Sequence, residues 1–266
     1  MQPAERVETD LPTIACIGIV AYVLGNLVHE DLGHGGACLL TGGRPLLVTT
    51  VNMDCSVDNR LVIAGGSIMN VVAAGLWFLL TRVSTAPHLR YFGWLSMTAN
   101  MLSAAGYLAF SGIGGFGDWA MFIQGFSPQW EWRVGLAVIG AAAYMLCVRW
   151  SLLVLRPLIG SDRERRVALA RRLSIPPYFA GAIVVCLAGA LNPQGWFLVA
   201  MSAAASTFGG SSALLWAPEW LRGSSIPAGP DAEGMPIPRS WAWIVVGVVM
   251  GVCFIFVLGR GIRFAG

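Results

Sequence analysis

Lysine is absent from this 266-residue chain, and charged residues of every kind are scarce. They make up 12% of the residues, whereas a soluble globular domain usually carries about 25%. All 17 basic residues are arginines, the net charge is only +3, and no basic run is interleaved with aromatic side chains. The shortage of charge excludes an ordinary water-soluble domain, and the missing basic runs exclude nucleic acid as an expected partner.

Histidine and cysteine are also rare. Three histidines are fewer than the diiron site of a lipid oxidase or desaturase generally needs, which disfavours that class of enzyme. The cysteines lie mostly inside apolar segments and have no paired spacing, so we expect small buried side chains and no disulfide framework. They are Cys16, Cys38, Cys55, Cys147, Cys186 and Cys253.

Long apolar stretches dominate what is present, because 56% of the residues are hydrophobic. A stretch of about 20 apolar residues can cross a membrane as a helix. We therefore predict an all-α, polytopic transmembrane helix bundle of six or seven spans that forms one integral membrane domain over residues 1–266. The uncertain span lies around the Asn192-Pro193-Gln194-Gly195 segment, which either joins two short crossings or breaks one long one. The expected spans are residues 11–40, 61–81, 90–110, 132–155, 177–191, 195–216 and 241–258.

The arginines predict how the bundle is oriented, since loops on the cytoplasmic side of a membrane are enriched in basic residues. Seven of the 17 cluster in or next to residues 156–175, which we expect to form a cytoplasmic loop. Counting spans backwards from it places the N-terminus in the cytoplasm as well. Arg260 and Arg263 would also prefer the cytoplasm, which favours six spans. No cleavable signal pattern precedes the first span, so we expect that helix to be retained.

Residues 44–60 differ from the spans. They contain a short β-branched run, Leu46 to Val51, bounded by glycine and polar residues. This pattern favours a strand or hairpin at the membrane surface, with a plain connecting loop as the alternative.

The first span carries an unusual cluster: His29, Glu30, Asp31 and His34. Ionisable groups inside a membrane cost a few kcal/mol each, so they are rarely found there without a partner or a function. Imidazole and carboxylate groups suit a catalytic Zn²⁺, which takes three protein ligands and a water. The alternative is a purely structural polar network between helices.

The spacing of the two histidines is unusual for a metal site. Zinc enzymes commonly place histidines four residues apart on a helix, whereas His29 and His34 are five apart. On a regular α-helix they would diverge by about 140°, and a single π-helical turn would realign them. Glu30 and His34 form an alternative ligand pair with regular spacing. Cys38, four residues after His34, could also serve a soft metal.

The stretch VHEDLGHGGACLLTGGR resembles the signature of the site-2 protease family of intramembrane zinc metalloproteases, with one extra residue between the histidines. Residues 64–70 (AGGSIMN) are similar to the family's Gly-Pro-x-x-Asn segment, with Ser67 in the place of proline. Gly117-Asp118-Trp119 lies where the family supplies an aspartate ligand. The resemblance covers roughly residues 14–123, so we expect a three-span metal-site core at 11–125 and additional spans at 126–266.

The resemblance implies a function. His29, His34 and Asp118 would hold zinc, and Glu30 would activate the water that attacks a peptide bond. The substrates would be membrane proteins or peptides in a bacterial inner membrane, and the strand near Val48 could pair with them. Asp118 could instead only cap a helix. A non-catalytic scaffold derived from a protease, which the altered spacing would suit, and a transporter are the alternative functions.

Overall fold

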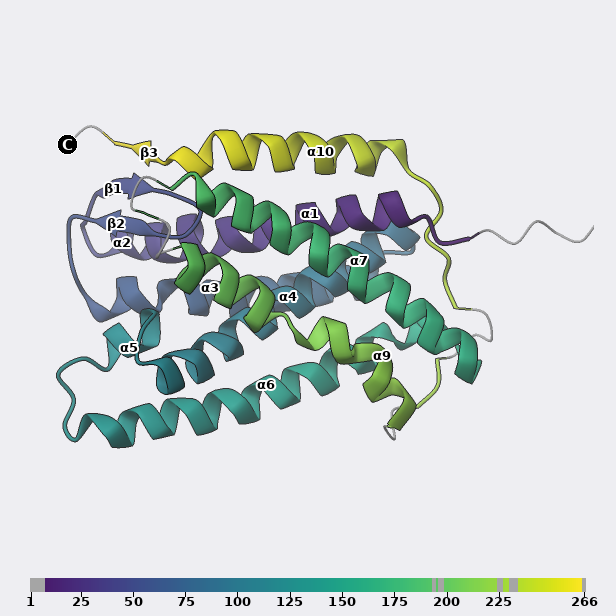
Figure 1. The fold of residues 1–266 in the computed structure, drawn as a ribbon, viewed down its shortest axis with the longest axis horizontal. Helices are drawn as coiled ribbons and strands as arrows, with labels where there is room; N and C mark the ends of the chain where they lie inside the picture. The colour runs from purple at the N-terminus through teal and green to yellow at the C-terminus, as the bar shows by residue number, and fades with distance from the viewer. Residues whose placement is uncertain (1–7, 193–194, 196–198, 224–226, 230–233, 265–266) are drawn as a thin grey trace, which may run out of the picture.

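The computed structural model describes residues 8–192, 195, 199–223, 227–229 and 234–264, and most of these are helical. Within these described residues, five helices are long and apolar enough to span a membrane: residues 11–40, 60–83, 129–159, 165–190 and 241–260. This agrees with the expected transmembrane bundle, and the count of six or seven spans stays a prediction. A small three-stranded sheet lies at one end of the bundle (Figure 1), so the fold is not purely α-helical.

The first span is one continuous helix in three parts: α1 (Leu11–Leu27), the π-helix η1 (Val28–Gly35) and α2 (Gly36–Leu40). Asp10 caps its start by accepting hydrogen bonds from the backbone N–H and the hydroxyl of Thr13. The change from α to π geometry falls on the cluster of ionisable residues, where the sequence predicted it.

Three long helices follow: α3 (Arg60–Val83), α4 (Pro87–Gly114) and α6 (Gln129–Ile159), with the short α5 (Asp118–Phe122) between the last two. α4 is the most buried of them and packs against both α3 and α6 (Figure 1). Gly140 of α6 lets the backbones approach closely, because a Cβ there would lie 2.2 Å from the backbone nitrogen of Ala109. α4 is not one of the five apolar helices, since buried polar residues such as Ser96 and Asn100 interrupt it.

The predicted arginine-rich loop at 156–175 is wrong. α6 continues to Ile159 and α7 (Arg163–Ala190) begins four residues later. Asp162 caps α7 by accepting a hydrogen bond from the backbone N–H of Arg165 at 2.7 Å. Arginine is a good helix former, so this segment extends the helix beyond its apolar part.

The part of the chain that the structure describes contains four more helices: the π-helix η2 (Val199–Gly210), α9 (Ala213–Gly223), α10 (Trp241–Phe256) and the short 3₁₀-helix η3 (Leu258–Arg260). Of the Asn192–Gly195 segment, Pro193 and Gln194 lie outside the described residues.

The hairpin expected in residues 44–60 is present. β1 (Pro45–Val48) pairs antiparallel with β2 (Met53–Cys55), and β3 (Ile262–Arg263) pairs with the other edge of β1. Val48 therefore already has partners on both sides, Met53 and Ile262. The hypothesis that a substrate adds to the strand at Val48 is wrong for this arrangement, because only β2 and β3 have an edge free of strand pairing among the described residues.

The expectation of no disulfide is also wrong. Cys38 and Cys55 form a disulfide, with their Cα atoms 5.9 Å apart. The hairpin folds back over the end of the first span and brings Cys55 to Cys38. This excludes Cys38 as a metal ligand.

The first and last spans run in the same direction. The N–H of Asp10 donates to the carbonyl of Ile237 before α10, and β3 after α10 pairs with β1. Arg263 therefore lies at the hairpin end, away from the Arg172 side chain, which is 4.0 Å from Glu8 at the start of the chain. The preference for six spans assumed that Arg260 and Arg263 lie on the same side of the membrane as the N-terminus. The structure places them at the opposite end of the bundle, so this reason for six spans does not hold.

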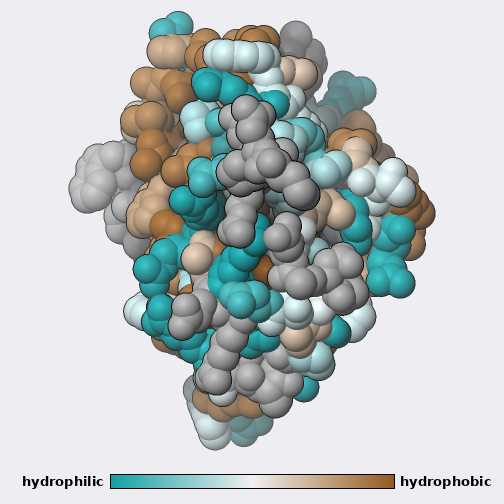
Figure 2. All heavy atoms as spheres, turned by 90° about the vertical axis from the view of Figure 1, so that its right-hand side faces the viewer, coloured by the Kyte–Doolittle hydropathy of each residue, from teal (hydrophilic) through white to brown (hydrophobic). Residues whose placement is uncertain are grey.

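Hydrophilic side chains gather on the end of the bundle where α1 begins, between apolar flanks (Figure 2).

Candidate metal centre

The π-helix η1 places the two histidines of the first span side by side. Their Nε2 atoms lie 3.3 Å apart although five residues separate them in sequence. Both side chains are buried, as is Glu30 between them in sequence. In π geometry residues five apart share a face, so the extra residue in the motif brings the imidazoles together.

Asp118 completes the cluster from a distant part of the chain. Its Oδ2 atom lies 3.2 Å from Nε2 of His29 and 3.5 Å from Nε2 of His34. Among the described residues, these three are the group of His, Cys, Asp and Glu side chains that could hold a metal ion. Burial of the Asp118 carboxyl opposes its ionisation, but hydrogen bonds with the two histidines outweigh this and hold its pKa well below the usual range.

The ring of His34 is oriented by the backbone of α3. Its Nδ1 atom lies 2.7 Å from the carbonyl oxygen of Val62, which can only accept a hydrogen bond. Nδ1 therefore carries a proton, which leaves Nε2, the nitrogen that faces His29 and Asp118, as the one that could bind a metal ion in place of its own proton. Metal-binding histidines are held in this manner in many proteins.

Small residues allow α3 to approach the site. A Cβ on Gly66 would lie 2.5 Å from Nε2 of His29 and 2.7 Å from Nε2 of His34. A Cβ on Gly33 would likewise lie 2.5 Å from Cα of Gly66. The two helices are thus in backbone contact, and no side chain fits between them.

The position of Asp118 depends on its neighbour in α5. The indole N–H of Trp119 donates a hydrogen bond to the hydroxyl of Ser67, with the two atoms 3.0 Å apart. Ser67 follows Gly66 directly, so this bond links α5 to the part of α3 that contacts the histidines. It joins the two segments that were matched separately to the protease motifs.

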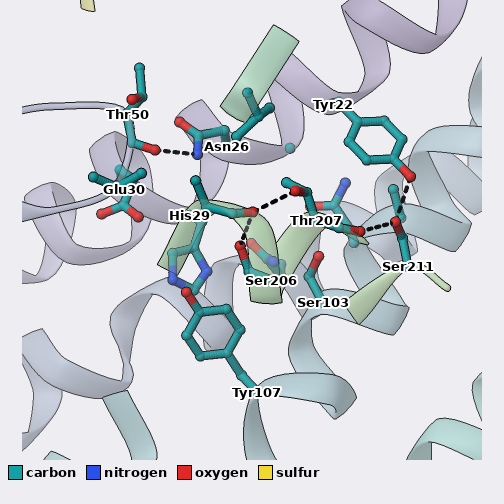
Figure 3. Close-up of a pocket in the computed structure, with 17 residues that line it drawn as sticks. Tyr22, Asn26, His29, Glu30, Thr50, Ser103, Tyr107, Ser206, Thr207 and Ser211 are labelled. Atoms are coloured by element: carbon teal, nitrogen blue, oxygen red, sulfur yellow. Dashed lines mark hydrogen bonds between the residues drawn. The ribbon is translucent and has the colours of Figure 1, made fainter. Parts of the chain in front are cut away.

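A polar cavity of about 50 Å³ adjoins the cluster (Figure 3). His29 and Glu30 form part of its wall, and hydroxyl groups from α4 and η2 form another part. The amide oxygens of Asn70 and Asn100, which also line it, have no hydrogen-bond partner. A cavity of this size and polarity has room for a few water molecules, which would satisfy these acceptors.

The structure brings together His29, His34 and Asp118, and it places Glu30 at the cavity beside them. Glu30 and His34 were the alternative pair of metal ligands. They are not hydrogen-bonded to each other, and Glu30 is not part of the group of side chains that could hold a metal ion. Asp118 is the first residue of α5, but its side chain forms no helix cap. The third histidine, His88, is remote and contacts the carbonyl of Pro238.

Several residues of the site were not predicted. Tyr107 stacks near His29, with ring centroids 5.0 Å apart, and Ser206 and Thr207 of η2 line the cavity. Nothing local in the sequence marks them, because each is an ordinary residue of an apolar helix. The orienting carbonyl of Val62 has no sequence signal either, since every residue carries one.

Family models, curated proteins and solved structures were each compared with this chain, and none matches it.

Proposed function

We propose that this protein is a membrane-embedded zinc metalloprotease that cuts peptide bonds of membrane-associated substrates. The observation that carries the proposal is the triangle formed by His29 Nε2, His34 Nε2 and Asp118 Oδ2, with sides of 3.3, 3.2 and 3.5 Å. In a tetrahedral zinc site with bonds of about 2.0–2.1 Å, two ligand atoms are separated by about 3.3–3.4 Å. The three atoms thus have the spacing of one face of such a tetrahedron.

The donor set supports zinc over other metals. Two imidazoles and one carboxylate suit a borderline metal ion, and three protein ligands leave one position for a water or substrate, as in catalytic zinc sites. A bound zinc ion would polarise a peptide carbonyl and make a water more acidic.

The residues of the chain supply the remaining functions. Glu30 is buried beside His29 and would accept the proton of the attacking water and pass it to the leaving amine. Asp118 and the carbonyl of Val62 would fix the imidazoles in one orientation. The polar cavity would supply water to a site that is otherwise surrounded by apolar helices.

The disulfide and the arginines support one orientation in the membrane. Disulfides persist in oxidising compartments such as the bacterial periplasm, and Cys38–Cys55 lies at the end of the bundle that holds the metal centre. Arg171 and Arg172 lie near the opposite end, where α1 begins. We place the start of α1 in the cytoplasm of a bacterial inner membrane and the metal centre toward the outside.

Metal content tests the proposal. Protein purified in detergent without chelators should contain nearly one zinc per chain by mass spectrometry. His34→Ala and Asp118→Ala should lose it, whereas His88→Ala should retain it, because His88 is remote from the cluster. A metal-free wild type would overturn the proposal and leave a polar helix network or a transport site.

Glu30→Gln separates an enzyme from a non-catalytic scaffold. It should retain zinc, because Glu30 is not part of the ligand triangle, and it should lose cleavage of a membrane-anchored reporter peptide. Equal cleavage by the variant and the wild type would remove Glu30 from the mechanism. Zinc binding without any cleavage by the wild type would favour the scaffold.

A further inference from the structure

An apolar groove is lined by residues of α3, α4 and α6 and by Trp119 of α5. Its volume is about 440 Å³, and it extends from Ser67 and Trp119 near the metal centre to Phe78 and Trp150. The wall is almost wholly apolar, and the polar atoms of Ser67 and Trp119 bond to each other. Val71 and Trp150 in this wall are 61% and 46% exposed, so the groove opens to the surroundings of the bundle.

A second pocket, of about 180 Å³, adjoins the groove at its far end. The two share Phe78 and Trp150, whose ring centroids are 5.5 Å apart. Unlike the groove, this pocket is basic, because Arg82 from the end of α3 and Arg90 from the start of α4 both line it. It therefore lies at the end of the bundle away from the hairpin.

The two arginines are available to a ligand. Neither forms an ion pair or a side-chain hydrogen bond with any residue that the structure describes. Guanidinium groups bind phosphate through paired N–H donors, and basic pockets between the cytoplasmic ends of membrane helices bind anionic lipid headgroups. The charge of the pocket thus fits a phosphate, and the groove beside it fits something apolar.

The size and chemistry of the groove decide between apolar ligands. A membrane helix about 10 Å across and about 30 Å long has a volume on the order of 2,400 Å³, far more than the groove offers. An extended peptide would leave its backbone N–H and C=O groups without partners against an apolar wall, which is costly in a membrane. A hydrocarbon chain has neither problem.

We propose that the basic pocket and the groove together bind one anionic phospholipid. The phosphate contacts Arg82 and Arg90, and one acyl chain passes Phe78 and Trp150 and runs along α3 toward Trp119. This site is separate from the metal centre, so the proposal does not depend on zinc or on proteolysis.

Lipid binding to the full chain can be measured by native mass spectrometry in detergent, with phosphatidylglycerol and phosphatidylcholine of identical acyl chains. We expect the wild type to prefer phosphatidylglycerol by on the order of tenfold. The double variant Arg82→Gln/Arg90→Gln should lose this preference. Arg149→Gln is the matched control, because Arg149 is an exposed arginine of α6 outside the pocket and should leave the preference unchanged.

The groove is tested by Gly75→Phe. A Cβ on Gly75 would meet no atom within 4 Å, so the ring can enter the groove without disturbing the helices. Binding of both lipids should weaken severalfold. Gly135→Phe on α6 is the control, since Gly135 also has open space but does not line the groove.

Three results would overturn the proposal. The first is equal binding of the two lipids by the wild type, and the second is an unchanged preference in the arginine double variant. The third is displacement of phosphatidylglycerol by an equal concentration of glycerol phosphate, which would show a site for phosphate alone. Should the double variant fail to fold, the Gly75→Phe and Gly135→Phe pair still distinguishes a bound chain from none.

Discussion

Trp119 donates its indole N–H to the hydroxyl of Ser67 across 3.0 Å, and each of the two residues is adjacent in sequence to a residue of the metal centre. Asp118 precedes Trp119, and Gly66, which contacts both imidazoles, precedes Ser67. This hydrogen bond therefore helps to hold the carboxylate beside the histidines, together with the bond from Arg60 of α3 to the carbonyl of Phe122 in α5.

Trp119→Phe should weaken zinc binding by about 10- to 100-fold, the usual loss when a group that orients a ligand is removed. Phenylalanine keeps the six-membered aromatic ring but has no N–H, so α5 loses its bond to Ser67 and retains the bond from Arg60 Nε of α3 to the carbonyl of Phe122. Zinc affinity measured by competition with a chelator checks this. Trp130→Phe is the control, because Trp130 is 65% exposed. Unchanged affinity in Trp119→Phe would show that the other contacts of α5 are enough to hold Asp118 in place.

Gly66→Ala should abolish or strongly reduce metal binding. The new methyl group would lie 2.5 Å from the His29 ring, which must move or push α3 away at a cost of about 1–3 kcal/mol. Gly36→Ala, in α2 just after the motif, adds the same methyl group where no atom lies within 4 Å. It should retain full zinc content. Equal zinc in both variants would contradict the close contact.

Deleting Leu32 should preserve the metal centre. Leu32 is 57% exposed within η1, and its removal leaves His-Glu-Asp-Gly-His, in which a regular α-helix places the histidines on one face. Deleting Val23 instead removes a buried residue of α1 and turns everything after it by about 100° relative to its neighbours. Zinc content and size-exclusion profiles should show a folded, loaded protein only for the Leu32 deletion.

Cys55→Ser should lower the free energy of unfolding by about 3 kcal/mol, the amount expected for a disulfide that closes a loop of this length. The two cysteines are 17 residues apart. Thermal unfolding of the variant should match that of reduced wild-type protein. Cys253→Ser, which changes a free exposed thiol, should unfold like the oxidised wild type. Stability that does not respond to a reductant would argue against the bond.

The sequence was most informative where its residues were least expected in a membrane. Charged groups in an apolar span are costly, so His29 and Glu30 stood out without any structure, and the five-residue spacing predicted the π-helical turn that is present. The resemblance of residues 117–119 to a protease motif placed Asp118 near the histidines, where it lies.

Long-range pairing was beyond the sequence. β3 has only two residues, and nothing in them indicates that they pair with β1 more than 200 positions earlier. Cys38 and Cys55 become neighbours only through the path of the hairpin, which spacing does not show. The rule that places arginines in cytoplasmic loops considers charge alone, so it did not predict that residues 163–175 are helical.

The three side chains of the ligand triangle are synthesised before the helices that cover α1. His29, His34 and Asp118 all belong to the first 118 of 266 residues, whereas α7 and α10, which cover α1, are made later. A ribosome that has made less than half of the chain has already produced every side chain of the ligand triangle. The nascent protein would thus contain all three side chains of the triangle before the helices that enclose the first span exist.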